Sequence, residues 1–288
     1  KMIERVQIPN TGTHISMEGK LYIDGKEQTR ENFNHIIVWE YAPSEKVLKA
    51  FSEVDRREFS PNEHKQFAYT NQIIPLEGAT ISQPSLIAKM IDCLDLKGRG
   101  FVLEVGTASG YTSAVLSKLA TRVDTIECNE TLASNATSLL DKLGFSNVNV
   151  HIGDGAAGYA QKAPYDSIIV TAAVKHVPVE LASQLIEGGR IVAPIGDGPE
   201  NTYLTVSKKI NGELVTTKLD QVWFMPLISD LAGGWKSDEE FEEAKQASVV
   251  KKTELFGEGF FTALAEKAGV QPGALLYALE NMQATDFK

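Results

Sequence analysis

Short apolar segments alternate with amphipathic segments through the middle of the chain. Helical spacing of apolar positions appears over Tyr111–Leu119 and Glu130–Leu143, and Gly144 ends the second helix. Continuous apolar strands that alternate with helices are typical of a parallel sheet covered on both faces. The pattern therefore predicts an α/β domain. Its five predicted parallel strands are 101–105, 123–127, 148–152, 167–170 and 190–195.

The pattern changes after the fifth predicted strand. Thr202–Ile210 and Leu214–Val222 are both strand-like, and only Asn211–Glu213 separates them. Such a short connection can join antiparallel strands but cannot make a parallel crossover. We therefore expect these two segments to pair as an antiparallel hairpin.

The two ends of the chain differ from this regular centre. Near the N-terminus, Lys20–Ile23 followed by an Asp24–Gly25 turn signal indicates a hairpin. After residue 227, acidic stretches with helical spacing alternate with glycine breaks, which predicts a helical extension. Its expected helices are Glu239–Val250, Phe260–Ala268 and Ala274–Met282. They suit a lid, an oligomerisation arm or a module that captures a peptide, although a plain solvated helix face has the same pattern.

Composition narrows the possible partners. The 288 residues carry a net charge of −10 without a dense Lys/Arg cluster, which argues against nucleic acid. No apolar run approaches the roughly 20 residues of a membrane helix, so no membrane partner is expected. Cys93 and Cys128 lack both metal-ligand spacing and an obvious disulfide neighbour. We therefore expect no metal site and a reducing, cytoplasmic location.

The first central strand ends in a glycine-rich turn. The segment Glu104–Gly110 reads Glu-Val-Gly-Thr-Ala-Ser-Gly and opens the helix at Tyr111. Glycines at such a turn let the backbone approach a ligand, and a helix N-terminus presents free N–H groups. The turn lacks the third glycine and the pyrophosphate seat of a dinucleotide fingerprint, which argues against NAD.

Acidic residues end the next two strands. Glu127 lies 21 residues after Gly106, where a carboxylate can accept hydrogen bonds from both ribose hydroxyls of an adenosine. The third strand ends in Gly153-Asp154-Gly155, whose carboxylate can reach an adenine amino group. Sites at the carboxyl ends of adjacent parallel strands share one crevice. The sequence therefore predicts an adenosine-containing ligand.

Further motifs resemble the protein-L-isoaspartate (D-aspartate) O-methyltransferase family, and they occur in that family's order from about Val47 to Leu227. They are Val54–Pro61, Ala68–Tyr69, Glu77–Pro84, Ala163–Ala173, Val177–Pro178 and Phe224–Leu227. The resemblance implies a Rossmann-like class I S-adenosylmethionine-dependent methyltransferase sandwich, with a mostly parallel seven-stranded sheet and a C-terminal antiparallel hairpin. It also implies S-adenosyl-L-methionine as cofactor and S-adenosyl-L-homocysteine as product.

The resemblance also implies roles for individual residues. Ser82 is expected to be the catalytic hydroxyl beside the reacting carboxylate. The implied cofactor-binding residues are Glu104, Gly106, Thr107, Ser109, Gly110, Glu127, Cys128, Asp154, Gly155 and Thr171. The implied substrate-binding residues are Thr80, Ile81, Gln83, Ala172, Ala173, Pro226 and Leu227.

The implied reaction is carboxyl methylation of an L-isoaspartyl residue, or of a dedicated aspartyl residue, in a protein or peptide. The methyl ester can then close to a succinimide. A carboxylate has a pKa of roughly 4 and is ionised at pH 7, so it needs no general base. Catalysis can therefore rest largely on orientation and close approach.

The predicted organisation has three parts. An N-terminal extension covers residues 1–34, a methyltransferase domain covers 35–227, and a helical C-terminal extension covers 228–288. Within the domain, 47–97 forms the acceptor-loop region and 98–227 the cofactor-binding core.

The chain departs from the family pattern at four places. Ala79 stands where the family usually has Gln, Ala108 where it has Gly, Asn71 where it has Asp, and Asp55 where it has Pro. The acceptor-loop departures leave the exact substrate open, and a small-molecule carboxyl or hydroxyl methyltransferase is an alternative. The changes at Ala79 and Ala108 also leave a non-catalytic cofactor-binding module as an alternative. A nucleic-acid methyltransferase is disfavoured because Thr171-Ala-Ala-Val replaces an Asn/Asp-Pro-Pro-Tyr-like motif.

Several single residues also have a purely structural interpretation. Ser82 precedes a Gln-Pro pair and a helix, so it can be a simple helix cap or a turn residue. His64, His151 and His176 carry no partner signal and are interpreted as structural.

Overall fold

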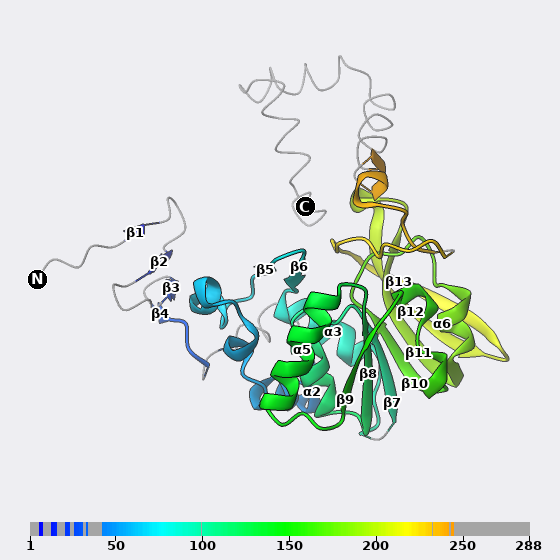
Figure 1. The fold of residues 1–288 in the computed structure, drawn as a ribbon, viewed down its shortest axis with the longest axis horizontal. Helices are drawn as coiled ribbons and strands as arrows, with labels where there is room; N and C mark the ends of the chain where they lie inside the picture. Colours follow the sequence, from blue (N-terminus) through cyan, green and yellow to red (C-terminus); the bar gives the residue numbers. More distant parts are fainter. Residues whose placement is uncertain are drawn as a thin grey trace, which may run out of the picture.

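The computed structural model describes residues 6–7, 13–15, 21–23, 26–30, 33, 42–98, 100–231, 233–241 and 243–244. Its centre is a seven-stranded sheet in the order β13-β12-β11-β10-β7-β8-β9 (Figure 1). The strands are β7 (Phe101–Val105), β8 (Arg122–Glu127), β9 (Val148–Ile152), β10 (Tyr165–Val170), β11 (Leu185–Gly196), β12 (Thr202–Ile210) and β13 (Glu213–Gln221). The first five are mutually parallel, and β12 and β13 are antiparallel. This confirms the predicted mostly parallel sheet with its closing hairpin.

The largest difference from the sequence prediction is at the start of β11. This strand begins at Leu185, five residues before the predicted start. The prediction placed the start later because Gly188 and Gly189 have the composition of a turn. The strand nevertheless continues past them, and its pairing with β10 shifts register between Tyr165 and Ser167. At such an irregularity a glycine weakens the strand pattern without ending the strand.

The closing hairpin has a shorter loop than predicted. Ile210 pairs with Glu213, so only Asn211 and Gly212 connect the strands. Their φ angles are +54° and +83°. Two left-handed residues match the twist of a two-residue hairpin, and Asn-Gly is the pair that adopts this conformation most readily.

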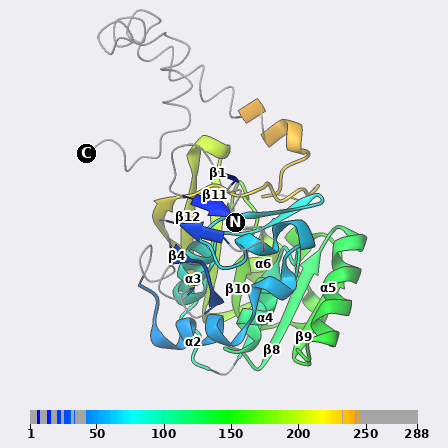
Figure 2. The same ribbon diagram turned by 90° about the vertical axis from the view of Figure 1, so that its left-hand side faces the viewer.

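Helices cover the two faces of the sheet unequally. One face is packed by α2 (Glu45–Glu53), α3 (Pro84–Cys93), α4 (Tyr111–Ser117) and α5 (Glu130–Lys142), and α2 contacts both α3 and α4 (Figure 2). The other face carries α6 (Val179–Ser183) and the short 3₁₀ turns η3 (Gly155–Ala157) and η4 (Ala160–Lys162). Neighbouring strand residues enter different cores, since Val102 packs under the first group and Leu103 under the second.

The acceptor-loop region lies before the first central strand. It contains the 3₁₀ turns η1 (Arg56–Phe59) and η2 (Asn62–Phe67) and a hairpin of β5 (Ile74–Leu76) and β6 (Ala79–Ile81). The hairpin leads directly into α3, which packs on β11. This path brings the region to the sheet at the ends of its parallel strands.

The N-terminal residues form a separate antiparallel sheet. Its strands are β1 (Val6–Gln7), β2 (Thr13–Ile15), β3 (Leu21–Ile23) and β4 (Lys26–Glu27). Ile23 pairs with Lys26, so β3 and β4 form the hairpin predicted here. Of the predicted C-terminal helices, Phe260–Ala268 and Ala274–Met282 lie outside the described residues, as does most of Glu239–Val250. None of the helices in the described part of the chain is long and apolar enough to cross a membrane.

Candidate active site

A cavity of about 470 Å³ opens at the carboxyl ends of the central parallel strands. The strand order reverses between β7 and β10, and ligands of open α/β sheets bind at such a switch point. Both the predicted cofactor side and the predicted acceptor side reach this cavity. The predicted site residues that line it are Thr80, Ile81, Ser82, Gln83, Gly106, Thr107, Ser109, Glu127, Cys128, Gly155, Thr171, Ala172, Pro226 and Leu227.

The glycine-rich turn after β7 forms one wall of the cavity. Gly106 has a φ of +97°, and a Cβ built there would lie 2.6 Å from the Thr171 hydroxyl oxygen. That hydroxyl lies 2.9 Å from the Gly106 carbonyl oxygen and 3.0 Å from the Val105 carbonyl oxygen. A side chain at Gly106 is therefore excluded, and the bare backbone faces the cavity.

Glu127, at the end of β8, is held in place by backbone amides. Its Oε2 accepts a hydrogen bond from the Ala108 amide at 2.9 Å, and its Oε1 accepts one from the Asn129 amide at 3.0 Å. The side chain lines the cavity although Glu127 is only 8% exposed. Each carboxylate oxygen has two acceptor positions, so Oε2 retains one for a ligand hydroxyl. Oε1 also accepts a weak hydrogen bond from the Cys128 thiol at 3.6 Å.

The acceptor loop forms the opposite wall. Ser82 and Gln83 connect β6 to α3, and both line the cavity. The Ser82 side chain is half-buried, and its hydroxyl makes no hydrogen bond to any described residue. The N-cap residue of α3 is Gln83, so the interpretation of Ser82 as a simple helix cap is wrong.

The chain matches one family along most of its described length. Residues 28–232 match the family described as "Protein-L-isoaspartate(D-aspartate) O-methyltransferase (PCMT)". The chain belongs to this family. A protein-L-isoaspartate O-methyltransferase of Roseiflexus sp. (strain RS-1) is 44% identical over 184 residues, which is 64% of this chain and 84% of the relative. One of Dictyoglomus turgidum is 43% identical over 208 residues, 72% of this chain and 93% of the relative.

Solved structures agree with this membership. A protein-L-isoaspartate O-methyltransferase structure has a TM-score of 0.64 at 30% identity, covering 71% of this chain and 67% of the other. A structure from Plasmodium falciparum in complex with S-adenosyl-L-homocysteine has a TM-score of 0.61 over 70% of this chain and 99% of the other; at 19% identity it shows the fold alone. The chain is therefore an S-adenosylmethionine-dependent methyltransferase of class I fold, acting on protein substrates that contain isoaspartate.

The cavity of this methyltransferase fits the cofactor. The bare backbone at Gly106 offers a close approach, and Glu127 offers acceptors for hydroxyl groups. Glu104, directly below the turn, is completely buried, and its Oε1 has no hydrogen-bond partner among the described residues. Its Oε2 accepts from the Thr125 hydroxyl at 2.8 Å and from the Ser113 hydroxyl. Burial raises the pKa of Glu104 to about 7.

Four predicted site residues do not line the cavity. Glu104 lies beneath it, and Gly110 serves as the N-cap of α4 with a φ of +83°. The Ala173 backbone bonds to Met225 and Leu227, at 2.7 and 2.8 Å, and so aligns the closing segment beside β10. These three residues shape the cavity through the backbone or from a buried position.

The fourth, Asp154, has two intramolecular partners. Its Oδ1 accepts from the Ala156 amide at 2.9 Å, and its Oδ2 accepts from the Ser229 hydroxyl at 2.6 Å. Gly155 lines the cavity in its place, where an added Cβ would lie 2.4 Å from Val105 Cγ1. A contact between Asp154 and the adenine amino group stays a prediction.

Arg56 anchors the acceptor loop, and sequence reasoning missed it. Its guanidinium is fully buried and donates to five backbone carbonyls of the acceptor-loop region, including that of Ser82 at 3.2 Å and that of Gln72 at 2.8 Å. Burial lowers the pKa of Arg56 to about 10, so the side chain stays charged at neutral pH. The Val54–Pro61 motif was the available signal, but it gives no indication of what Arg56 binds.

Asn71 makes the hydrogen bond that caps the N-terminus of α3. Its Oδ1 accepts from the Ser85 amide at 2.9 Å and so caps the helix, as an aspartate would. Its Nδ2 is buried without a partner among the described residues. The departure from the family's Asp therefore keeps the acceptor loop anchored and adds one unsatisfied donor.

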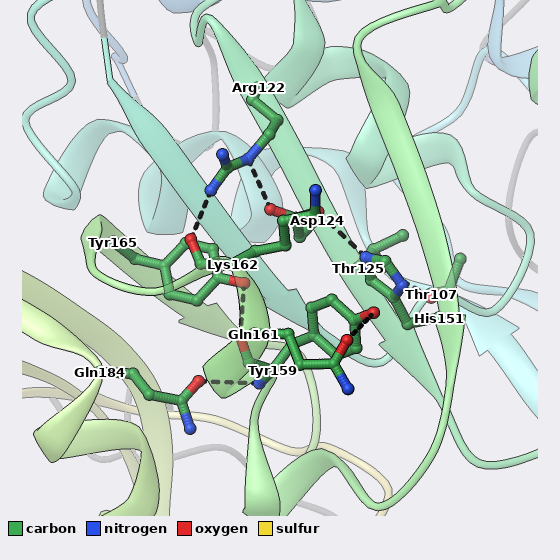
Figure 3. Close-up of polar contacts among 10 residues, drawn as sticks. All are labelled: Thr107, Arg122, Asp124, Thr125, His151, Tyr159, Gln161, Lys162, Tyr165 and Gln184. Carbon is green, nitrogen blue, oxygen red and sulfur yellow. Dashed lines mark hydrogen bonds and ion pairs between the residues drawn. The ribbon is translucent and has the colours of Figure 1, made fainter.

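None of the histidines in the described part of the chain lines the cavity. His151 Nε2 lies 3.0 Å from Asp124 Oδ1, and its ring stacks on Tyr159 at 3.6 Å (Figure 3). Arg122 Nε donates to the other oxygen of Asp124 at 2.7 Å. This network fills a buried region between β8, β9 and η4, which supports the structural interpretation of His151.

Proposed function

We propose that this methyltransferase esterifies the free carboxylate of an L-isoaspartyl residue, with Ser82 as the hydroxyl that orients it. The single observation behind this proposal is that the unpartnered Ser82 hydroxyl and the glycine-rich turn line the same cavity. S-adenosylmethionine supplies a methyl group bonded to a positively charged sulfur, which a carboxylate can attack without prior deprotonation. The resulting methyl ester is a good substrate for closure to a succinimide, the step through which isoaspartate is repaired.

The protein's own task in this reaction is orientation. The Ser82 hydroxyl donates a hydrogen bond to a carboxylate oxygen of the acceptor and keeps its proton. Arg56 holds the Ser82 carbonyl, so the hydroxyl is carried on an anchored backbone. Because the acceptor is already ionised at pH 7, no histidine or carboxylate has to act as a base.

The cofactor side is assigned to residues of the turn and of the neighbouring strand ends. Glu127 is positioned by the Ala108 and Asn129 amides, which supports its role as acceptor for the two ribose hydroxyls. Gly106 provides close backbone approach, and Thr171 braces it from β10.

The domain boundaries are also a proposal. We keep the methyltransferase domain at 35–227 as the catalytic unit, with residues 1–34 and 228–288 as extensions. The first part of the C-terminal extension packs on this unit, because Trp235 is buried and its amide donates to the Leu227 carbonyl at 2.8 Å. A cytoplasmic location is supported by Cys93 and Cys128, both of which are free thiols.

The proposal is tested with two synthetic peptides that differ only in having L-isoaspartate or aspartate at one position. Methyl transfer from labelled S-adenosylmethionine is measured for the wild type, Ser82→Ala, and the control Ser138→Ala, whose exposed hydroxyl lies on α5. We expect labelling of the isoaspartyl peptide alone. Loss of one orienting donor lowers kcat/KM by about 100-fold in Ser82→Ala.

Binding separates the possible outcomes. S-adenosylhomocysteine affinity, measured by calorimetry, should be the same in all three proteins. Intact binding without labelling of the isoaspartyl peptide would refute the proposal. Labelling of free carboxylate metabolites in preference to the peptide would establish the small-molecule alternative instead.

A further inference from the structure

Three large apolar side chains stand exposed at the opening of the cavity. Ile73 is 43% exposed, Trp223 51% and Ile228 38%, and all three line the cavity. We refer to these three residues as the apolar rim. They come from two segments of the chain, the residues before β5 and the residues after β13, so no single local pattern accounts for their meeting at one opening.

The backbone directs each of these side chains away from the core. Ile73 precedes the completely buried Ile74, and Trp223 precedes Phe224, which is 4% exposed. Ile228 lies between the buried residues Leu227 and Ser229. In extended backbone successive side chains point to opposite sides, so burial of one neighbour exposes the other. The rim is therefore formed by two segments anchored beside the cavity, one before β5 and one after β13.

The charged residues at the opening neutralise one another. Lys89 and Asp220 both line the cavity and form an ion pair across it, joining α3 to the end of β13. Among the described residues lining the cavity, the other charged side chain is Glu127. An acidic group arriving beside the acceptor thus meets a paired lysine, a buried carboxylate and a chain of net charge −10.

We propose that the apolar rim, with Trp223 as its principal contact, binds an aromatic or aliphatic side chain next to the isoaspartyl residue of the substrate. The inference rests on the proposed function, because it assigns the cavity to an isoaspartyl peptide. Tryptophan offers a large contact area at small cost in side-chain entropy, and buried aromatic anchors dominate recognition surfaces. The preferred substrates are therefore isoaspartyl sites with apolar neighbours, and sites with acidic neighbours are the poorest.

The test uses three peptides of equal length with L-isoaspartate at the centre. The flanking positions carry phenylalanine in the first peptide, serine in the second and glutamate in the third. Wild type, Trp223→Ser, Trp223→Phe and Val215→Ser are compared by kcat/KM, and by calorimetric peptide binding to S-adenosylhomocysteine-saturated protein. Val215 is the matched control because it is 55% exposed on β13 and does not line the cavity.

We expect the wild type to prefer the phenylalanine peptide over the serine peptide by about tenfold, in kcat/KM and in affinity. The ratio should fall to about twofold or less in Trp223→Ser, and it should survive in Trp223→Phe and Val215→Ser. The glutamate peptide should be the poorest for every protein that keeps the rim.

Each contrary result has a distinct meaning. Methylation of all three peptides at equal rates by the wild type would overturn the inference and leave the proposed function intact. An unchanged ratio in Trp223→Ser would also overturn it, and a concurrent change of oligomeric state by light scattering would make the rim a self-association surface. No methylation of any isoaspartyl peptide would overturn the proposed function and the inference together.

Discussion

Replacing Ala108 by glycine should stabilise the protein. Ala108 lies in the turn between β7 and α4 and has a φ of +47°, in the left-handed region that L-residues with a Cβ avoid. Its amide donates to Glu127 Oε2, so the backbone conformation is fixed by the cofactor-site carboxylate. Glycine can adopt the same conformation and keep the same hydrogen bond without the steric cost.

The size of the effect follows from two opposing contributions. The left-handed conformation costs a residue with a Cβ about 1–2 kcal/mol. Glycine recovers this, but its greater freedom in the unfolded chain costs about 0.5–1 kcal/mol. The net gain for Ala108→Gly is thus about 0.5–1 kcal/mol in the free energy of unfolding. In a chain of this size, each kcal/mol of added stability raises Tm by about 2–4 °C. The expected rise in Tm for Ala108→Gly is therefore about 1–4 °C.

Urea denaturation and thermal melts of the wild type and Ala108→Gly measure this gain. The matched control is Ala160→Gly, an exposed position of η4 with an ordinary negative φ, where we expect a loss of about 0.5–1 kcal/mol. S-adenosylhomocysteine affinity should change by less than about threefold, because the Ala108 amide is retained. A loss of stability in Ala108→Gly equal to that of the control would refute the reasoning, since it would mean that the left-handed conformation carries no cost.

Three further predictions concern buried or cavity-lining carboxylates. Glu127→Gln should weaken S-adenosylhomocysteine binding by about tenfold in calorimetry, because an amide cannot accept at both oxygen positions; unchanged affinity would contradict the assignment. Asp124→Asn should lower the free energy of unfolding by about 3 kcal/mol in urea, because it removes the charge that pairs with Arg122 and His151 in a fully buried position. Glu104 has a raised pKa of about 7, so its contribution to stability is most favourable below the unfolded pKa and falls as pH rises to 7. The stability of the wild type relative to Glu104→Gln should therefore drop by about 3 kcal/mol between pH 4.5 and pH 8, and a constant difference would show that Glu104 ionises normally.

The sheet was predictable because its strands are short, apolar and regularly spaced. Hydrophobic periodicity alone located β7, β8, β9, β12 and β13 to within a residue or two. The start of β11 was not predictable in the same way, since the glycines at 188 and 189 imitate a turn and pairing with β10 overrides that local signal. Tertiary pairing, which the local sequence does not encode, decides such boundaries.

The candidate site divides along similar lines. Glu127 and Ser82 could be placed from the sequence, because motif spacing fixes them at the end of a strand and in a loop before a helix. Arg56 and Ser229 could not, because their partners are distant in the sequence: Ser82 lies 26 residues from Arg56, and Asp154 lies 75 residues from Ser229. The exposure of Trp223 could not be predicted for another reason. An apolar residue is expected in the core, and Trp223 is exposed only because its neighbour Phe224 is buried in the folded segment.

The departures of this chain from its family bear on which isoaspartyl sites it accepts, since its methyltransferase activity follows from the family. At Ala108 and Asn71 the substituted residues keep the contacts that the site needs, namely the amide bonded to Glu127 and the oxygen that caps α3. Both therefore affect stability more than chemistry. Ala79 differs, because it lines the cavity beside the acceptor loop, where a smaller side chain leaves more room for the substrate.

Among these three positions, Ala79 alone therefore bears on the choice of substrate. Restoring the family's residue with Ala79→Gln tests this role. If the smaller side chain adapts the cavity to a bulky apolar neighbour, Ala79→Gln lowers kcat/KM for the phenylalanine peptide relative to the serine peptide. An equal effect on both peptides would contradict this role.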